Sequence, residues 1–133
     1  MKRAPQGYRI KTRELLVDPR AYVSSQIVED DLTKSTRTEL LKHGEMVGYV
    51  DTVLTRDHRW ETHSYLDQEE RGKGFGSLLY TKAINFNMKR HRKVCSSKAP
   101  SIQAKRVWTS RVLSELFLIN YDGIGYNVIK RLD

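Results

Sequence analysis

Six residues near the middle of the chain have the composition of a phosphate-binding loop. Residues 71–76 are Arg-Gly-Lys-Gly-Phe-Gly, and a helical pattern begins at Ser77. Glycines at alternate positions leave little side-chain cover, so the backbone N–H groups can turn toward an anion. A helix that follows directly points the positive end of its dipole at the same place. A turn that only joins a strand to a helix is the alternative, but the coincidence of cation, glycines and helix favours a phosphate site.

The spacing of these glycines selects one kind of loop. No window fits the Walker pattern Gly-x-x-x-x-Gly-Lys-Ser/Thr, and a dinucleotide fingerprint would need a third glycine where the chain has Ser77. The pattern Arg-x-x-Gly-x-Gly does fit, with Arg71, Gly74 and Gly76. In this pattern, and in the strand-like approach 65–71, the chain resembles the GNAT (GCN5-related N-acetyltransferase) superfamily. The pyrophosphate loop of that superfamily carries Gln/Arg-x-x-Gly-x-Gly/Ala.

The resemblance implies a co-substrate and the residues that hold it. The co-substrate is acetyl-CoA, and the acceptor is an amine on a protein, a small molecule or a nucleic acid. The residues implied around acetyl-CoA are Tyr65, Leu66, Arg71, Gly72, Lys73, Gly74, Phe75, Gly76, Ser77 and Ser101. Leu66 would bind the pantetheine through its backbone. We expect no metal, because the four histidines have no metal-ligand spacing and the single cysteine cannot complement them.

Two residues of the strand expected at 60–66 are candidates for the catalytic base. An amine with a pKa near ~10.4 is almost fully protonated at neutral pH, so acetyl transfer needs a group that takes its proton. Alternation along a strand places Glu61, His63 and Tyr65 on one face. Glu61 is the first candidate by position, and His63 is the second because its ordinary pKa lies near ~6.5. For each residue the alternative is a solvated or hydrogen-bonded strand side chain.

The group that protonates the leaving thiolate is harder to identify. Many members of the family place a tyrosine in the second helix, but the chain has Trp108 at that position. An indole N–H is a far poorer acid than a phenol. Tyr121 is therefore the candidate acid, with Tyr126 beside it in the sequence and water as a further alternative.

The charge of the chain is unevenly distributed. The formal net charge is +8, and residues 71–114 hold 11 cations and no carboxylate. The phosphates of CoA account for part of this positive field. The excess favours either an acidic acceptor or a solvated basic face. The alternative function is therefore a catalytically altered GNAT-like module that binds or acylates nucleic acid through its basic half.

The 133 residues predict one domain, residues 1–133, with an α/β (α+β) fold. Strands are expected at 8–10, 22–28, 38–42, 46–54, 60–66, 94–97, 116–119 and 126–129, and helices at 77–89 and 102–113 with Ser101 as a cap. This order agrees with the GNAT core over roughly residues 38–130. The resemblance implies a mixed, mostly antiparallel sheet with helices on both faces. Residues 1–37 match poorly, and the two early helices of the family are not evident.

Three features favour the cytoplasm. No apolar run approaches the ~20 residues that cross a bilayer. The basic N-terminus precedes no hydrophobic segment of the kind found in secretory signals. A single cysteine excludes an internal disulfide.

Overall fold

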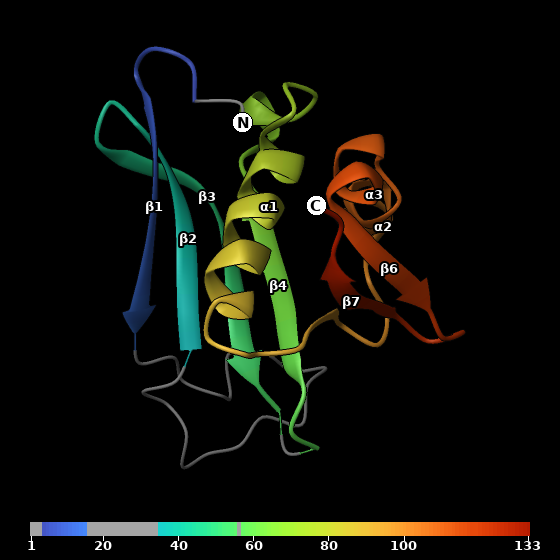
Figure 1. Ribbon diagram of the computed structural model, residues 1–133. Coiled ribbons are helices and arrows are strands. Elements are labelled where there is room, and N and C mark those ends of the chain that lie inside the picture. The colour runs from blue at the N-terminus through green and yellow to red at the C-terminus, as the bar shows by residue number, and fades with distance from the viewer. Residues whose placement is uncertain (1–3, 16–34, 56) are drawn as a thin grey trace.

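The computed structural model describes residues 4–15, 35–55 and 57–133 (Figure 1). In chain order the elements are β1 (Tyr8–Leu15), β2 (Ser35–Lys42), β3 (Glu45–Leu54), β4 (Trp60–Leu66), the 3-10 helix η3 (Gln68–Glu70), α1 (Phe75–Met88), β5 (Val94–Ser96), α2 (Ile102–Trp108), α3 (Arg111–Leu116), β6 (Phe117–Tyr121) and β7 (Tyr126–Arg131). The strand predicted at 22–28 lies outside the described residues, as does most of the poorly matched N-terminal part. The strand predicted at 8–10 is longer than expected and ends at Leu15.

The strands form one seven-stranded sheet in the order β1-β2-β3-β4-β5-β7-β6. Neighbouring strands are antiparallel except β4 and β5, which are parallel. This arrangement confirms the predicted mixed, mostly antiparallel fold. The predicted hairpin between β2 and β3 turns at His43 and Gly44, both of which have positive φ (49° and 85°). Two left-handed central residues are what a type I′ turn requires, and this turn matches the twist of the flanking strands.

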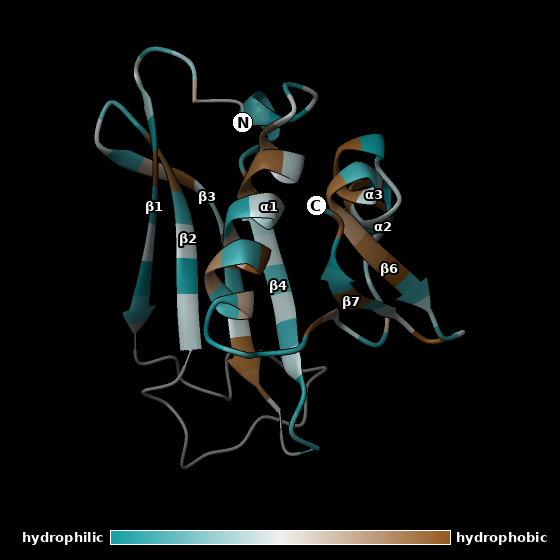
Figure 2. Cartoon of the chain, in the orientation of Figure 1, coloured by the Kyte–Doolittle hydropathy of each residue, from teal (hydrophilic) through white to brown (hydrophobic). Residues whose placement is uncertain are grey.

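The core lies between α1 and one face of the sheet. Leu79, Ala83 and Ile84 of α1 pack against Leu40 of β2 and Val50 of β3, and all five side chains are buried. Trp108, Leu113 and Phe117 extend the same core toward the C-terminal half. Figure 2 shows hydrophobic colour along β6 and on turns of α1, whereas β4 is pale or hydrophilic. A polar strand in the middle of a sheet is unusual, because central strands normally carry apolar residues on their buried faces.

The helix predicted at 102–113 is wrong in one respect, because the structure divides it into α2 and α3. Thr109 ends α2, and the Ser110 side chain accepts a hydrogen bond from the Leu113 N–H to cap α3. A serine side chain that bonds to the backbone competes with continuation of the helix. The predicted cap at Ser101 is confirmed, since its hydroxyl accepts from the Ala104 N–H at 3.1 Å. None of the helices in the described ranges is long and apolar enough to span a membrane.

Candidate active site

The centre of the sheet opens between its two parallel strands. β5 pairs with β4 only at three positions, Trp60 with Val94, Glu61 with Cys95 and Thr62 with Ser96. Within the described residues, no other strand pairs with this side of β4, so a gap begins directly after Thr62. Because β3 remains paired with all of β4, only one edge of β4 is released.

The backbone of β4 turns hydrogen-bonding groups into this gap. The Asp67 N–H donates to the Val47 carbonyl at 2.8 Å, which fixes the odd-numbered residues as those bonded to β3. Bonded and non-bonded pairs alternate along an antiparallel ladder, so the backbone groups of Ser64 and Leu66 point to the gap. The Leu66 carbonyl accepts a hydrogen bond from Nε of Arg71 at 3.0 Å. The predicted backbone role of Leu66 is consistent with this orientation.

A cleft of about 590 Å³ continues from the gap to the glycine loop. It is lined by residues of β3, β4, the loop, α1 and α2. Of the ten residues implied around acetyl-CoA, eight line this cleft: Tyr65, Leu66, Arg71, Gly72, Gly74, Gly76, Ser77 and Ser101. Lys73 and Phe75 do not line it. Lining residues that the sequence analysis missed include Ser64, Tyr80, Gln103 and Arg106.

The glycines of the loop have two separate functions. Gly72 and Gly74 adopt φ of +78° and +84°, a left-handed conformation that favours glycine, and their Cα atoms face open space. Gly74 is the N-cap of α1, has no side chain to bond the first N–H groups, and leaves them directed at the cleft. Gly76 instead permits close packing, because a Cβ there would lie 3.0 Å from Cγ2 of Val107 in α2. The resulting N-terminus is positive, and no acidic residue lies in its first turn.

A buried carboxylate supports the loop from behind. Glu70 is 2% exposed, and its carboxylate accepts hydrogen bonds from the Tyr8 hydroxyl at 2.6 Å, from Lys73 at 3.1 Å and from Lys42 at 3.3 Å. The hydrogen bond from Tyr8, aided by the two lysines, lowers the pKa of Glu70 from 4.5 to about 2. The Phe75 ring packs on Tyr8 with centroids 4.7 Å apart. Phe75 therefore packs the loop against β1, Lys73 contacts Glu70, and neither residue lines the cleft.

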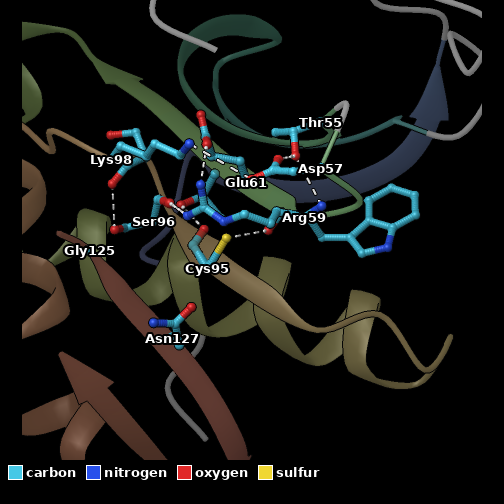
Figure 3. A network of polar contacts seen from close by, with 12 residues as sticks. Thr55, Asp57, Arg59, Glu61, Cys95, Ser96, Lys98, Gly125 and Asn127 are labelled. Carbon is cyan, nitrogen blue, oxygen red and sulfur yellow. Dashed lines mark hydrogen bonds and ion pairs between the residues drawn. The ribbon is translucent and has the colours of Figure 1, made fainter. Parts of the chain in front are cut away.

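Glu61 and His63 lie next to each other on the opposite face of the sheet from α1. His63 Nε2 is 2.9 Å from Oε1 of Glu61. The other carboxylate oxygen of Glu61 accepts from Nη1 of Arg59 at 3.3 Å, and the Arg59 guanidinium also donates to the Ser96 carbonyl at 3.2 Å (Figure 3). Two of the three predicted catalytic residues are thus brought together where the gap begins.

The third predicted catalytic residue lies elsewhere. Tyr121 is at the end of β6, is 53% exposed, and packs on the Tyr126 ring with centroids 4.9 Å apart. It does not line the cleft. Trp108, at the position where family members carry tyrosine, is buried between Tyr80 at 5.4 Å and Tyr126 at 6.0 Å. Its indole N–H has no hydrogen-bond partner within the described part of the chain.

Tyr80 of α1 carries a hydroxyl at the wall of the cleft. Its Oη lies 2.8 Å from Oγ of Ser64 on β4, and its side chain is buried. Burial raises the pKa of Tyr80, against hydrogen bonds from Ser64 and Thr62 that lower it. The sequence analysis did not single out this residue. The available signal was a tyrosine about one turn into the helix that follows the glycine loop. A phenol that such a helix buries usually has a hydrogen-bond partner.

Many cations of the basic stretch 71–114 make contacts inside the chain. Between residues that the structure describes, ion pairs join five of the eleven cations to acidic partners: Lys73 with Glu70, Arg90 and Arg92 with Glu14, Lys98 with Asp57, and Arg111 with Glu115. The Arg92 guanidinium also stacks on the Trp60 ring at 4.2 Å. Two further arginines, Arg71 and Arg106, line the cleft. This distribution favours the interpretation in which the cations serve the cleft and solvated ion pairs.

Cys95 and the groups of His, Cys, Asp and Glu side chains were the remaining candidates for chemistry among the described residues. Burial raises the pKa of the Cys95 thiol to about 11, so the thiol stays protonated at neutral pH. Across residues 4–15, 35–55 and 57–133, no group of three or more His, Cys, Asp or Glu side chains is arranged to hold a metal ion.

Comparison with solved structures supports the same fold. The chain is similar to a GCN5-related N-acetyltransferase-like protein from Streptococcus suis 89/1591, with a TM-score of 0.57 and 14% sequence identity. The superposition covers 96% of this chain and 49% of that protein, so the chain spans about half of its length. At this identity the likeness concerns the fold alone. Among curated protein sequences, none matches the chain.

Comparison with protein families is more specific. The family described as Acetyltransferase (GNAT) matches residues 9–110, which include the gap, the glycine loop, α1 and α2. The match begins well before residue 38, where the resemblance was first evident in the sequence, so β1 lies within it. The chain therefore belongs to the GNAT family of acetyltransferases.

Proposed function

We propose that the protein is an acetyl-CoA-dependent N-acetyltransferase that moves an acetyl group to a primary amine. One observation carries the proposal: the gap beside β4 is continuous with the uncapped N-terminus of α1 in a single cleft. One end of this cleft has the N–H groups and positive charge for a diphosphate, and the other reaches polar side chains in the centre of the sheet. Acetyl-CoA, a thioester on a long arm that carries a diphosphate, needs a site with both ends.

The residues of the cleft fit acetyl-CoA. The open space over Gly72 and Gly74 admits a pyrophosphate that a side chain would exclude, and the arginine side chains Arg71 and Arg106 add positive charge. The released backbone groups of Ser64 and Leu66 are available to the amides of the pantetheine. This arm then directs the thioester toward the point where β5 closes the gap at Thr62.

The two faces of the sheet divide the chemistry. The amine approaches from the face that carries Glu61 and His63, and this pair accepts its proton. Arg59 holds one oxygen of the Glu61 carboxylate while the other contacts His63, an arrangement in which one residue orients the other. The amine nitrogen forms its bond to the acetyl carbon, and the Ser64 N–H is placed to stabilise the oxyanion.

Thermal unfolding with acetyl-CoA tests the proposal. Saturating acetyl-CoA raises Tm, because a ligand that binds only the folded state stabilises it. Gly74→Glu abolishes this shift, since a carboxylate then lies where the diphosphate binds. Gly123→Glu is the matched control, because Gly123 also has a positive φ (+91°) and open space but lies in the turn before β7. Absence of a shift in the wild-type protein at millimolar acetyl-CoA contradicts the proposal.

Transfer is then measured with a panel of acceptors. Release of free CoA thiol is followed with small amines, lysine peptides and RNA as separate acceptors. Transfer to at least one amine is the expected result. Salt-dependent binding to RNA with no thiol release from any acceptor would instead support a binding module.

A further inference from the structure

A tyrosine hydroxyl lines the cleft at a position other than the one where GNAT family members carry their tyrosine. Trp108 stands at the usual tyrosine position, and its ring packs against Tyr80 at 84° in an edge contact. The Tyr80 hydroxyl in turn lies beside the Ser64 hydroxyl. Ser64 is two residues past Thr62, where the pairing of β4 with β5 ends, so this part of β4 borders the gap. A phenol from α1 thus stands at the wall of the cleft, and the indole of α2 holds it in place.

The path of the cofactor arm brings the sulfur to this hydroxyl. In the proposed function the arm enters at the glycine loop and runs along β4 from Leu66 toward Thr62. It cannot pass Thr62, because β5 is paired there with β4. The thioester therefore ends beside Ser64, where Tyr80 bonds to the strand from the α1 side. Glu61 and His63 lie on the opposite face of β4 from Ser64 and Tyr80.

We propose that Tyr80 is the general acid that protonates the leaving CoA thiolate, an inference that rests on the proposed function. As the tetrahedral intermediate collapses, the C–S bond breaks and its electron pair remains on sulfur. The Tyr80 Oη–H proton moves to that sulfur, which leaves as the CoA thiol. After the CoA thiol leaves, the phenolate recovers its proton from solvent that enters the cleft, since Tyr80 lines it. The proton lost by the amine goes to the Glu61–His63 pair, so the protons balance.

The surroundings of Tyr80 suit a proton donor. Burial favours the neutral phenol, so the group enters each cycle carrying its proton. The phenolate that forms is stabilised by the Ser64 hydroxyl, which lies 2.8 Å from the phenol oxygen. Trp108 packs edge-on against the Tyr80 ring, with centroids 5.4 Å apart, and both side chains are buried.

Removal of the hydroxyl is the first test. Tyr80→Phe lowers kcat by roughly 10²–10⁴-fold, the usual contribution of a general acid, while the acetyl-CoA Kd and the acetyl-CoA-dependent Tm shift stay unchanged. Thr81→Val removes a neighbouring hydroxyl from the same helix and is the control for a lost buried hydrogen bond, with kcat unchanged. If Tyr121→Phe abolishes turnover and Tyr80→Phe does not, the assignment is overturned.

A pH series separates an acid from a structural side chain. Fluorinated tyrosines at position 80 have more acidic phenols, so the basic limb of the kcat profile moves to lower pH as fluorine is added. A limb that does not move with the phenol overturns the assignment even if Tyr80→Phe is slow. Failure of the two ideas is distinguishable. If the wild-type protein neither binds nor uses acetyl-CoA, both fail, but if it turns over and Tyr80→Phe keeps its kcat, only the Tyr80 assignment fails.

Discussion

The two ends of the cleft are built from different parts of the chain. The phosphate end, which we propose binds the diphosphate, is made of backbone from one continuous segment, Arg71 to Ser77, held from behind by Glu70. The proposed reacting end has Ser64 of β4 and Tyr80 of α1 in its wall, and Glu61 and His63 lie on the opposite face of β4. A backbone site tolerates few residue types because conformation is the requirement. A side-chain site depends on which hydroxyl or carboxylate reaches the gap.

The largest expected effect breaks the reacting end alone. Glu61→Gln and His63→Gln each lower kcat by roughly 10²–10⁴-fold because the pair no longer accepts the proton of the amine. The acetyl-CoA Kd stays unchanged, since neither side chain lines the cleft. Steady-state kinetics with calorimetric titration of acetyl-CoA measures both quantities. A kcat that recovers at high pH in His63→Gln but not in Glu61→Gln would assign the proton to His63.

A substitution at the phosphate end has the opposite signature. Gly74→Ala places an L-residue at φ +84°, which costs roughly 1–2 kcal/mol. The exposed loop escapes this strain in the free protein, and binding must restore the conformation. Acetyl-CoA affinity therefore falls by about tenfold, while kcat at saturation is retained. Gly123→Ala, with the same strain in the turn before β7, should leave the affinity unchanged. An equal loss in both variants would show a general effect on stability.

The phosphate end could be predicted from sequence because its requirements are local. Alternate glycines, a cation and a following helix are adjacent in the chain, and eight of the ten implied residues line the cleft. The placement of Glu61 and His63 on one face could be predicted for a similar reason, since alternation along one strand is also a local pattern.

The proposed acid, Tyr80, could not be predicted from a local sequence pattern. Tyr80 and Ser64 are 16 residues apart, and only the packing of α1 on β4 brings their hydroxyls together. Tyr121 was selected as a nearby hydroxyl in the sequence, but it lies on the Tyr126 ring at the end of β6. The break between α2 and α3 escaped prediction because Thr109 and Ser110 contain no glycine or proline to mark it. The break is instead explained by the Ser110 side chain, which caps the start of α3.

Acid titration probes the support behind the phosphate end. The pKa of Glu70 is about 2 in the folded protein against 4.5 ordinarily, so the carboxylate contributes stability that is complete above pH 4.5. This contribution is lost as pH falls from 4.5 toward 2, where the folded protein also takes up the proton. Glu70→Gln is therefore less stable at pH 7 and shows a flatter decline below pH 4.5 in urea unfolding. Glu115→Gln, which breaks an exposed pair with Arg111, is the control and keeps the wild-type decline.

The smallest expected effect concerns the partner of the acid. Ser64→Ala removes the hydroxyl 2.8 Å from Tyr80 but leaves the phenol packed against Trp108. Loss of one such hydrogen bond costs about 1 kcal/mol, so kcat falls by roughly fivefold and Tm by a few degrees. The acetyl-CoA Kd is the internal control, since the strand backbone that faces the arm is unchanged. A loss as large as that of Tyr80→Phe would mean that the proton reaches sulfur from Ser64, and that the phenol only orients the serine.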